Sequence, residues 1–145
     1  MLRKTDTEII KLLRLNGRIK PKEMSALTNL PLSTVYEKMT NTGLLVTRFT
    51  CLLNHDAFGN TVHAFAVLKV APKDRFALQK ELEICNNVNL LWRINNGSDF
   101  VAEFIFPNLF TFEAYKELLE SQFAIRNIVL HFMIDEIKRE TFIPG

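Results

Sequence analysis

The stretch NLPLSTVYEKMTNTGLL, residues 29–45, decides the fold of the first third of the chain. It opens with Asn29, a residue that tolerates the left-handed backbone conformation of a tight turn. A short helix over residues 32–42 is predicted next, and Gly43 is expected to end it. At about 100° per residue, one face of this helix is apolar and carries Leu32, Val35, Tyr36 and Met39. The opposite face is polar, and the apolar core does not account for it.

Two more helices are predicted before this one. The first begins at Asp6 as its N-cap and ends at a left-handed stop formed by Asn16 and Gly17. The second begins at Pro21, a residue favoured at a first helical position. Their apolar residues are Ile9, Ile10, Leu13, Met24 and Leu27. Three short helices with a tight turn before the third form a helix-turn-helix unit, whose third helix would enter the major groove of DNA.

The polar face of the third helix supplies the candidate DNA contacts. These are Ser33, Thr34, Glu37, Lys38 and Asn41, whose side-chain types reach base edges or phosphates. Glu37 would either accept a hydrogen bond from a cytosine amino group or discourage nonspecific binding. Lys20, Lys22 and Arg48 are expected on phosphates. Arg48 belongs to LLVTRFTCLLN, residues 44–54, which alternates enough to predict a β-ribbon or wing.

The charge distribution separates two halves of the chain. Residues 1–50 hold nine Lys and Arg against four Asp and Glu, a net charge of +5. Residues 51–145 hold nine against twelve, a net charge of −3. A basic small half joined to an acidic larger half favours a polyanion as the partner of the first half only. The alternative is that this charge only keeps a small domain soluble and that the polar helix face is simply solvated.

The second half alternates strands and helices in the order βαββαβ, which is the ferredoxin-like split unit. The predicted fold class is therefore α+β. Residues 1–50 form a helix-turn-helix DNA-binding domain, residues 51–61 a wing or linker, and residues 62–145 a ferredoxin-like effector-binding and oligomerisation domain. The helices should cover the sheet face that carries Phe100, Ala102, Phe104 and Phe106.

Matching the apolar faces of the two middle strands requires Ile94 to lie opposite Phe100. That register leaves an odd number of residues between the two strands, which excludes a two-residue turn at Asn96 and Gly97. A loop of three or five residues is therefore expected. The other face of the sheet is then open and largely apolar, and it needs a partner. A second copy of the chain is the economical one, through an interface bearing Phe65, Val67, Leu91 and Met133.

The chain resembles the Lrp/AsnC family of feast/famine transcription regulators. The resemblance covers nearly the whole chain and rests on the order and spacing of DTEIIKLLRLNGRI, NLPLSTV, GLLVTRFTCLLNHDAFG and NNGSDFVAEFIFPN. It implies an N-terminal helix-turn-helix, a ferredoxin-like domain, binding to double-stranded DNA, dimerisation through the sheet domain and assembly into tetramers or octamers. The chain departs from the family in a shorter segment between Val35 and Gly43, in Pro31 where a serine N-cap is usual, and in Asn96 where a glycine is usual.

The resemblance also implies a small-ligand loop at Asn96, Gly97, Ser98 and Asp99. In the family the matching loop takes the charged groups of a free amino acid. Asp99 would accept from its α-ammonium group, and backbone N–H groups near Gly97 would receive its carboxylate. Gly97 allows close backbone approach, which a Cβ would obstruct. The alternative is that Gly97 only turns the hairpin and Asp99 caps its loop.

Other functional classes leave little trace in the sequence. No run of residues is apolar enough for a membrane span, and the first twenty residues resemble neither a signal nor a transit peptide. Cys51 and Cys85 are interpreted as reduced thiols in a cytoplasmic protein. No cofactor, metal or enzymatic activity is expected. Two alternatives stay open. The first is a dimeric interaction module that does not bind DNA. The second is an enzyme resembling the haem-biosynthesis decarboxylases, whose candidate polar residues on one sheet face would be His63, His131, Glu103 and Arg93.

Overall fold

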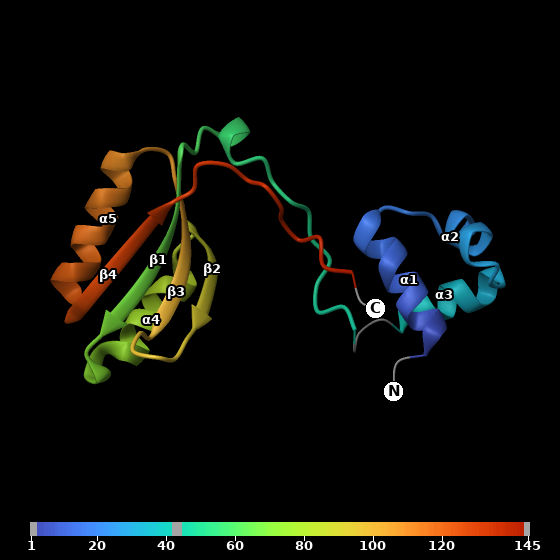
Figure 1. The fold of residues 1–145 in the computed structure, drawn as a ribbon, viewed down its shortest axis with the longest axis horizontal. Coiled ribbons are helices and arrows are strands. Elements are labelled where there is room, and N and C mark those ends of the chain that lie inside the picture. The colour runs from blue at the N-terminus through green and yellow to red at the C-terminus, as the bar shows by residue number, and fades with distance from the viewer. Residues whose placement is uncertain (1–2, 42–44, 144–145) are drawn as a thin grey trace. The chain divides into compact units, whose positions relative to one another are not determined.

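The computed structural model describes residues 3–41 and 45–143 of the chain. The chain divides into two compact units, one comprising Met1–Leu52 with Ile137–Gly145 and the other comprising Leu53–Glu136. Figure 1 shows three helices in the first unit and a sheet with helices in the second. Within the described residues, no helix has the length and apolar character needed to cross a bilayer.

The first unit contains α1 (Lys4–Leu15), α2 (Pro21–Thr28) and α3 (Leu32–Thr40). Its core is formed by Ile9, Ile19, Met24 and Val35, with Leu12, Leu13, Leu30 and Met39 packed against them. Pro21 is the first residue of α2, and Asn29 follows that helix in the left-handed conformation, with φ of 55°. Both features confirm the predicted helix-turn-helix geometry.

The predicted ends of α1 were wrong. The N-cap is Arg3, and its backbone N–H donates to Asp6 Oδ2 across 3.3 Å, so Asp6 lies inside the first turn. A carboxylate is favourable there because it accepts from an unpaired N–H and faces the positive end of the helix dipole. Asn16 is extended, with φ of −146°, and its backbone N–H donates to Leu12 O, so α1 ends without a left-handed residue. Gly43, the expected stop of the third helix, lies outside the described residues.

Two further expectations for the first unit were wrong. Leu27, Leu32 and Tyr36 were expected in the core, but all three are exposed. The core of three short helices is small, and Val35 with Met39 fills the part that faces α3. The described residues 45–54 form neither helix nor strand, so the predicted β-ribbon is not formed there.

A segment from the end of the chain belongs to the first unit and is called here the C-terminal strap, residues 137–143. Arg14 of α1 holds it. Its Nε donates to Phe142 O across 3.0 Å, and its Nη2 donates to Glu140 O. Glu140 Oε2 also lies 3.4 Å from the guanidinium, and Glu140 has a positive φ of 52°. The guanidinium therefore binds mainly the backbone of the strap.

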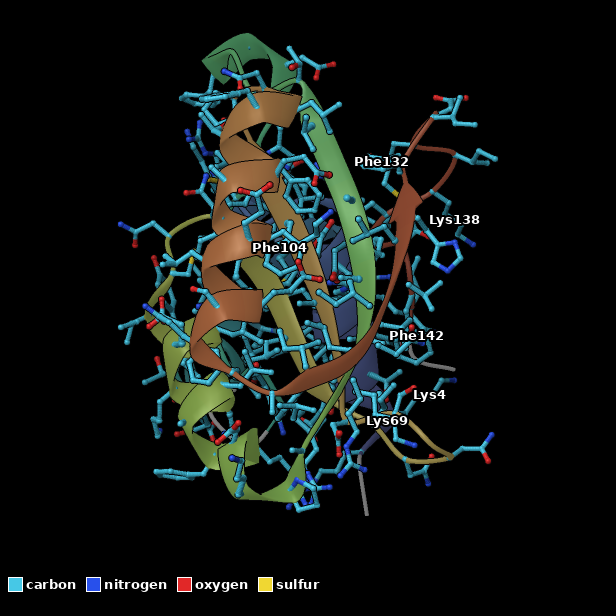
Figure 2. All side chains as sticks on the ribbon, turned by 90° about the vertical axis from the view of Figure 1, so that its left-hand side faces the viewer. Lys4, Lys69, Phe104, Phe132, Lys138 and Phe142 are labelled. Carbon is cyan, nitrogen blue, oxygen red and sulfur yellow. The ribbon has the colours of Figure 1, made fainter. Side chains whose placement is uncertain are left out.

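The second unit contains β1 (Val62–Val70), α4 (Arg75–Ile84), β2 (Val88–Arg93), β3 (Phe100–Phe106), α5 (Leu109–Gln122) and β4 (Ile125–Phe132), with short 3₁₀ turns at Asp56–Phe58 and Pro72–Asp74. The strands form one antiparallel sheet in the order β2-β3-β1-β4, which confirms the ferredoxin-like prediction. Phe104 points toward α5 (Figure 2), where its ring centroid lies 5.7 Å from that of Phe112. Leu78, Leu82, Phe112 and Leu119 of the two helices join the strand residues in one core.

The predicted register of the central hairpin was wrong by one residue. Phe100 lies opposite Arg93, not Ile94, and the Ile94 N–H donates to Asp99 O across 2.9 Å. Asn96 and Gly97 both have positive φ, 63° and 93°, as a type I′ hairpin turn requires. The parity argument failed because a β-bulge at Asn89, between Val88 and Leu90, shifts the pairing of β2.

The bulge changes which residues of β2 face the helices. Leu91 lies opposite Ala102 and packs against the core, so its predicted place on the open sheet face was wrong. Arg93, opposite Phe100, was likewise assigned to the wrong face. Leu90 and Trp92, which lie opposite Glu103 and Val101, face the open side instead.

Candidate nucleic-acid interface and assembly surface

The outward face of α3 is narrower than the sequence pattern predicted. Ser33 and Glu37 are exposed, and Asn41, the C-cap of the helix, is exposed as well. Thr34 and Lys38 are half-buried. The structure therefore brings Ser33 and Glu37 together on the solvent side of α3.

Lys38 is engaged in an ion pair inside the first unit. Its Nζ lies 2.6 Å from Asp6 Oδ1, and both side chains keep only about a fifth of their surface exposed, 19% and 21%. The hydrogen bond from Lys38 holds the pKa of Asp6 below its ordinary value of 3.8, and the Arg3 backbone N–H contributes in the same direction. Lys38 thus links the middle of α3 to the first turn of α1.

The basic residues predicted on phosphates are available to solvent. Lys20 is the N-cap of α2, Lys22 lies in the first turn of that helix, and both are exposed. Arg48 is exposed in the segment that follows α3. None of these three side chains forms an ion pair with another residue of the ranges 3–41 and 45–143.

Sequence reasoning missed the apolar part of the exposed helix surface. Leu32 and Tyr36 keep 42% and 55% of their surface exposed. The short length of α3 could have identified them. A helix of nine residues buries only a narrow stripe, and Val35 with Met39 already fills it, so Leu32 and Tyr36 remain outside the core. The Thr40 hydroxyl donates to Tyr36 O across 2.9 Å, so this hydroxyl is occupied within the helix.

The open face of the sheet is the side opposite the two helices. Register pairing places Phe65 between Glu103 and His131, and Val67 between Val101 and Val129. Met133 lies beyond β4, and its N–H donates to His63 O across 2.8 Å. Trp92 on β2 keeps 62% of its surface exposed. The face is therefore apolar at its centre, around Phe65 and Val67.

One buried carboxylate interrupts this apolar face. Glu103 is almost completely buried, and its Oε1 is hydrogen-bonded to His63 Nε2. Its Oε2 accepts from Asn89 Nδ2 across 2.6 Å, so the bulge in β2 supplies the second partner. His131, expected beside His63, does lie on the neighbouring strand. Within residues 3–41 and 45–143, no group of three metal-ligating side chains gathers anywhere.

The loop at Asn96–Asp99 has a definite internal structure. Asp99 Oδ2 accepts from the buried Val70 N–H across 3.0 Å, and Oδ1 lies 2.7 Å from Arg75 Nε of α4. The Val70 hydrogen bond, with Arg75 as a further cause, keeps the pKa of Asp99 below its ordinary value. Asp99 thus joins β1 and α4 to the hairpin, while Asn96 and Gly97 are exposed at its tip. A Cβ at Gly97 would meet open space, but its φ of 93° favours glycine.

Comparison with known proteins adds sequence and fold relatives. Residues 2–40 match the family described as winged helix-turn-helix DNA-binding. The chain is 35% identical over 68 residues to the HTH-type transcriptional regulator FL11 of Pyrococcus abyssi. That match covers 45% of this chain and 44% of the relative, so it spans less than half of the relative's length.

Several solved structures match nearly the full length of the chain. One is a transcriptional regulator of Neisseria meningitidis, solved as an L-Met complex, with a TM-score of 0.89 and 21% sequence identity. The match covers 99% of this chain and 97% of that protein's chain. An AsnC family transcriptional regulator of Agrobacterium tumefaciens has a TM-score of 0.86 at 15% identity, with the same coverage. These two proteins are similar to this chain in fold, and each is described as a transcriptional regulator. The chain therefore has the fold of the Lrp/AsnC regulators, and the segment that matches the winged helix-turn-helix family contains α1, α2 and α3.

Proposed function

We propose that this chain is a sequence-specific DNA-binding transcriptional regulator that acts as a homodimer or higher oligomer and responds to a small polar effector. The observation that carries the proposal is the solvent face of α3, which presents Ser33 and Glu37 on a helix-turn-helix unit. The match of residues 2–40 to a winged helix-turn-helix DNA-binding family supports it. In this geometry the N-terminal residues of the third helix contact base edges in the major groove.

The proposed contacts divide into two kinds. Ser33, Glu37 and Asn41 contact base edges, because they are polar, exposed and carried by α3. Lys20, Lys22 and Arg48 contact phosphates, because they are exposed cations outside that helix. Thr34 is half-buried on the same helix and is kept as a further proposed contact, whereas Lys38 orients α3 through its ion pair with Asp6.

Binding to mixed-sequence DNA at several salt concentrations tests the proposal. Affinity should fall steeply as salt rises, because each phosphate contact releases bound counterions. Lys22→Ala should lower the slope of log affinity against log salt by about 1 and weaken all sequences alike. Asn41→Ala should leave the slope unchanged and relax preference at one position. Weak DNA binding that does not depend on salt would contradict the proposal and favour a dimeric interaction module that does not bind DNA.

The open sheet face is proposed as the homodimer interface. Its centre, formed by Phe65 and Val67 with their strand neighbours, is apolar, and both helices of the second unit pack on the other side of the sheet. An apolar sheet face of this extent needs a covering partner. A second copy presents the same surface, so a twofold axis through the face satisfies both chains. Met133 remains in the proposed interface, and Trp92 replaces Leu91.

An amino-acid effector is proposed for the loop Asn96–Asp99. Its support is the L-Met complex of the Neisseria neighbour and the exposed glycine turn, where backbone N–H groups can approach a carboxylate. Because the Asp99 carboxylate is already bound by Val70 N–H and Arg75, an α-ammonium group would have to compete with the Arg75 guanidinium.

A further inference from the structure

We propose that Tyr36 is a base-reading residue whose ring receives the 5-methyl group of a thymine in the major groove. This inference rests on the proposed function and deepens it, because it assigns a specificity-determining role to a residue expected in the core. Tyr36 keeps 55% of its surface exposed, and Leu32 keeps 42%. The two residues are four apart in α3, so they lie on the same side of the helix, within its first two turns.

The rotation of α3 about its axis is set by contacts on its other side. Val35 is completely buried in the core of the first unit, and Met39 packs against the same core. Lys38 is tied to Asp6 of α1. Because these three contacts fix the other side of α3 against the unit, Tyr36 faces solvent. Ser33 and Thr40, three residues before it and four residues after it, lie next to it on the helix surface.

The exposed helix face is apolar along one flank and polar along the other. Leu32, Tyr36 and Thr40 follow one another at helical spacing along the apolar flank. Thr40 is exposed, and its hydroxyl donates to the carbonyl of Tyr36, so the methyl group is the part of its side chain left for an apolar contact. Ser33 and Glu37 occupy the polar flank.

The chemistry of the major groove identifies the occupant of the apolar flank. Base edges in that groove offer hydrogen-bond donors and acceptors, and the 5-methyl of thymine is their characteristic apolar group. A tyrosine ring beside a leucine side chain and a threonine methyl complements that group, while Ser33 and Glu37 on the same helix can engage the neighbouring polar edges. A tyrosine hydroxyl can instead bind a phosphate, and the experiment separates the two roles.

The experiment replaces thymines one at a time. Duplexes enriched by the wild-type protein from a random pool are resynthesised with deoxyuridine in place of each thymine, which removes only the methyl group. Wild type should lose about fourfold in affinity at one position, the effect of returning one methyl group to water. Tyr36→Ala should bind the thymine and deoxyuridine duplexes equally, and Tyr36→Phe should keep the preference for thymine. Leu27→Ala, which truncates an exposed apolar side chain of α2, is the matched control and should keep it as well.

The other outcomes overturn the assignment in distinguishable ways. If wild type binds DNA with steep salt dependence but no deoxyuridine substitution weakens it, Tyr36 does not read a methyl group and the proposed function stands. If Tyr36→Phe loses affinity as Tyr36→Ala does, on every duplex alike, the residue contacts a phosphate through its hydroxyl. If no duplex is enriched and binding shows no salt dependence, the proposed function fails together with this inference.

Discussion

Lys38 of α3 and Asp6 of α1 form an ion pair, with 2.6 Å between Nζ and Oδ1. It joins the helix that carries the proposed base contacts to the first turn of the first helix. The Lys38 charge is therefore engaged within the first unit. We expect Lys38 to affect DNA binding only through the positions of Ser33 and Glu37.

Breaking this ion pair from either side should have the same effect on DNA binding. We expect Asp6→Asn and Lys38→Met to weaken specific binding to a similar extent, and the double variant to be no weaker than either single one, because both remove one interaction. The slope of log affinity against log salt should not change. A slope lowered by about 1 in Lys38→Met alone would instead show a direct phosphate contact.

The same pair makes the stability of the first unit sensitive to acid. The pKa of Asp6 is lower in the folded protein than its ordinary value of 3.8. The ionised carboxylate therefore contributes its full stabilisation above that value, and the contribution is lost as the pH falls through the lower, folded-state pKa. Thermal melts of wild type and Asp6→Asn should differ at neutral pH and converge in acid. A constant difference down to acid pH would contradict this.

A charge at the centre of the open sheet face should separate the homodimer. Val67→Asp places a carboxylate in an apolar interface at a cost of about 3–5 kcal/mol per buried copy. Light scattering at micromolar concentration should then give the mass of a single chain. Phe76→Asp, which adds the same charge to an exposed position of α4, is the control and should keep the wild-type mass. If the mass of Val67→Asp equals that of the wild type, the proposed interface is wrong.

Trp92 provides an intrinsic signal for the same interface. It is the single tryptophan of the sequence and lies on the open face with 62% of its surface exposed. Association should bury the indole and shift its emission to shorter wavelength, and dilution should reverse the shift. Val67→Asp should show the emission of the dilute protein at every concentration. Emission that stays constant while the mass changes would place β2 outside the interface.

Asp99 should matter for stability as well as for the effector. Asp99→Ala leaves the buried Val70 N–H without its acceptor, which should cost about 1–3 kcal/mol of unfolding free energy in urea titrations. Asp99→Asn retains an acceptor oxygen and loses only the charge toward Arg75, so its loss should be smaller. Equal losses in both variants would show that the charge, and not the hydrogen bond, is what the fold requires.

Calorimetry against the twenty amino acids tests the effector. We expect heat with at least one of them, and no heat with Asp99→Ala. Arg75→Met should bind that amino acid more tightly than wild type, because the α-ammonium no longer competes with the guanidinium for Asp99 Oδ1. Equal heat for wild type and Asp99→Ala would place the site elsewhere. Heat from none of the twenty would leave a regulator without this effector site.

The order of helices and strands could be predicted because each element carries a local signal. The apolar stretches VHAFAVLKV and FVAEFIF marked β1 and β3, and Pro21 and Asn29 marked the ends of α2. The register of β2 could not be predicted, because it depends on a bulge at Asn89 that leaves no local signature. Asn89 bonds Glu103, a residue fourteen positions further along the chain, and only the folded sheet brings the two together.

The candidate DNA interface was predicted at the level of its helix and not of each side chain. Ser33 and Glu37 were predicted on the polar face and are exposed. The pairing of Lys38 with Asp6 and the exposure of Tyr36 depend on how three helices divide a small core, which one helical wheel does not encode. The Asp99 contacts to Val70 and Arg75 likewise join the hairpin to residues more than twenty positions earlier in the sequence.

The C-terminal strap gives the first unit a discontinuous sequence. Residues 3–41 and residues 137–143 belong to one compact body, although the whole sheet unit lies between them along the chain. A fragment that ends at Leu52 would contain all three helices and would still leave the Arg14 guanidinium without the two carbonyl groups that it binds. A fluorophore attached at position 142 would therefore report on the unit of the proposed DNA contacts.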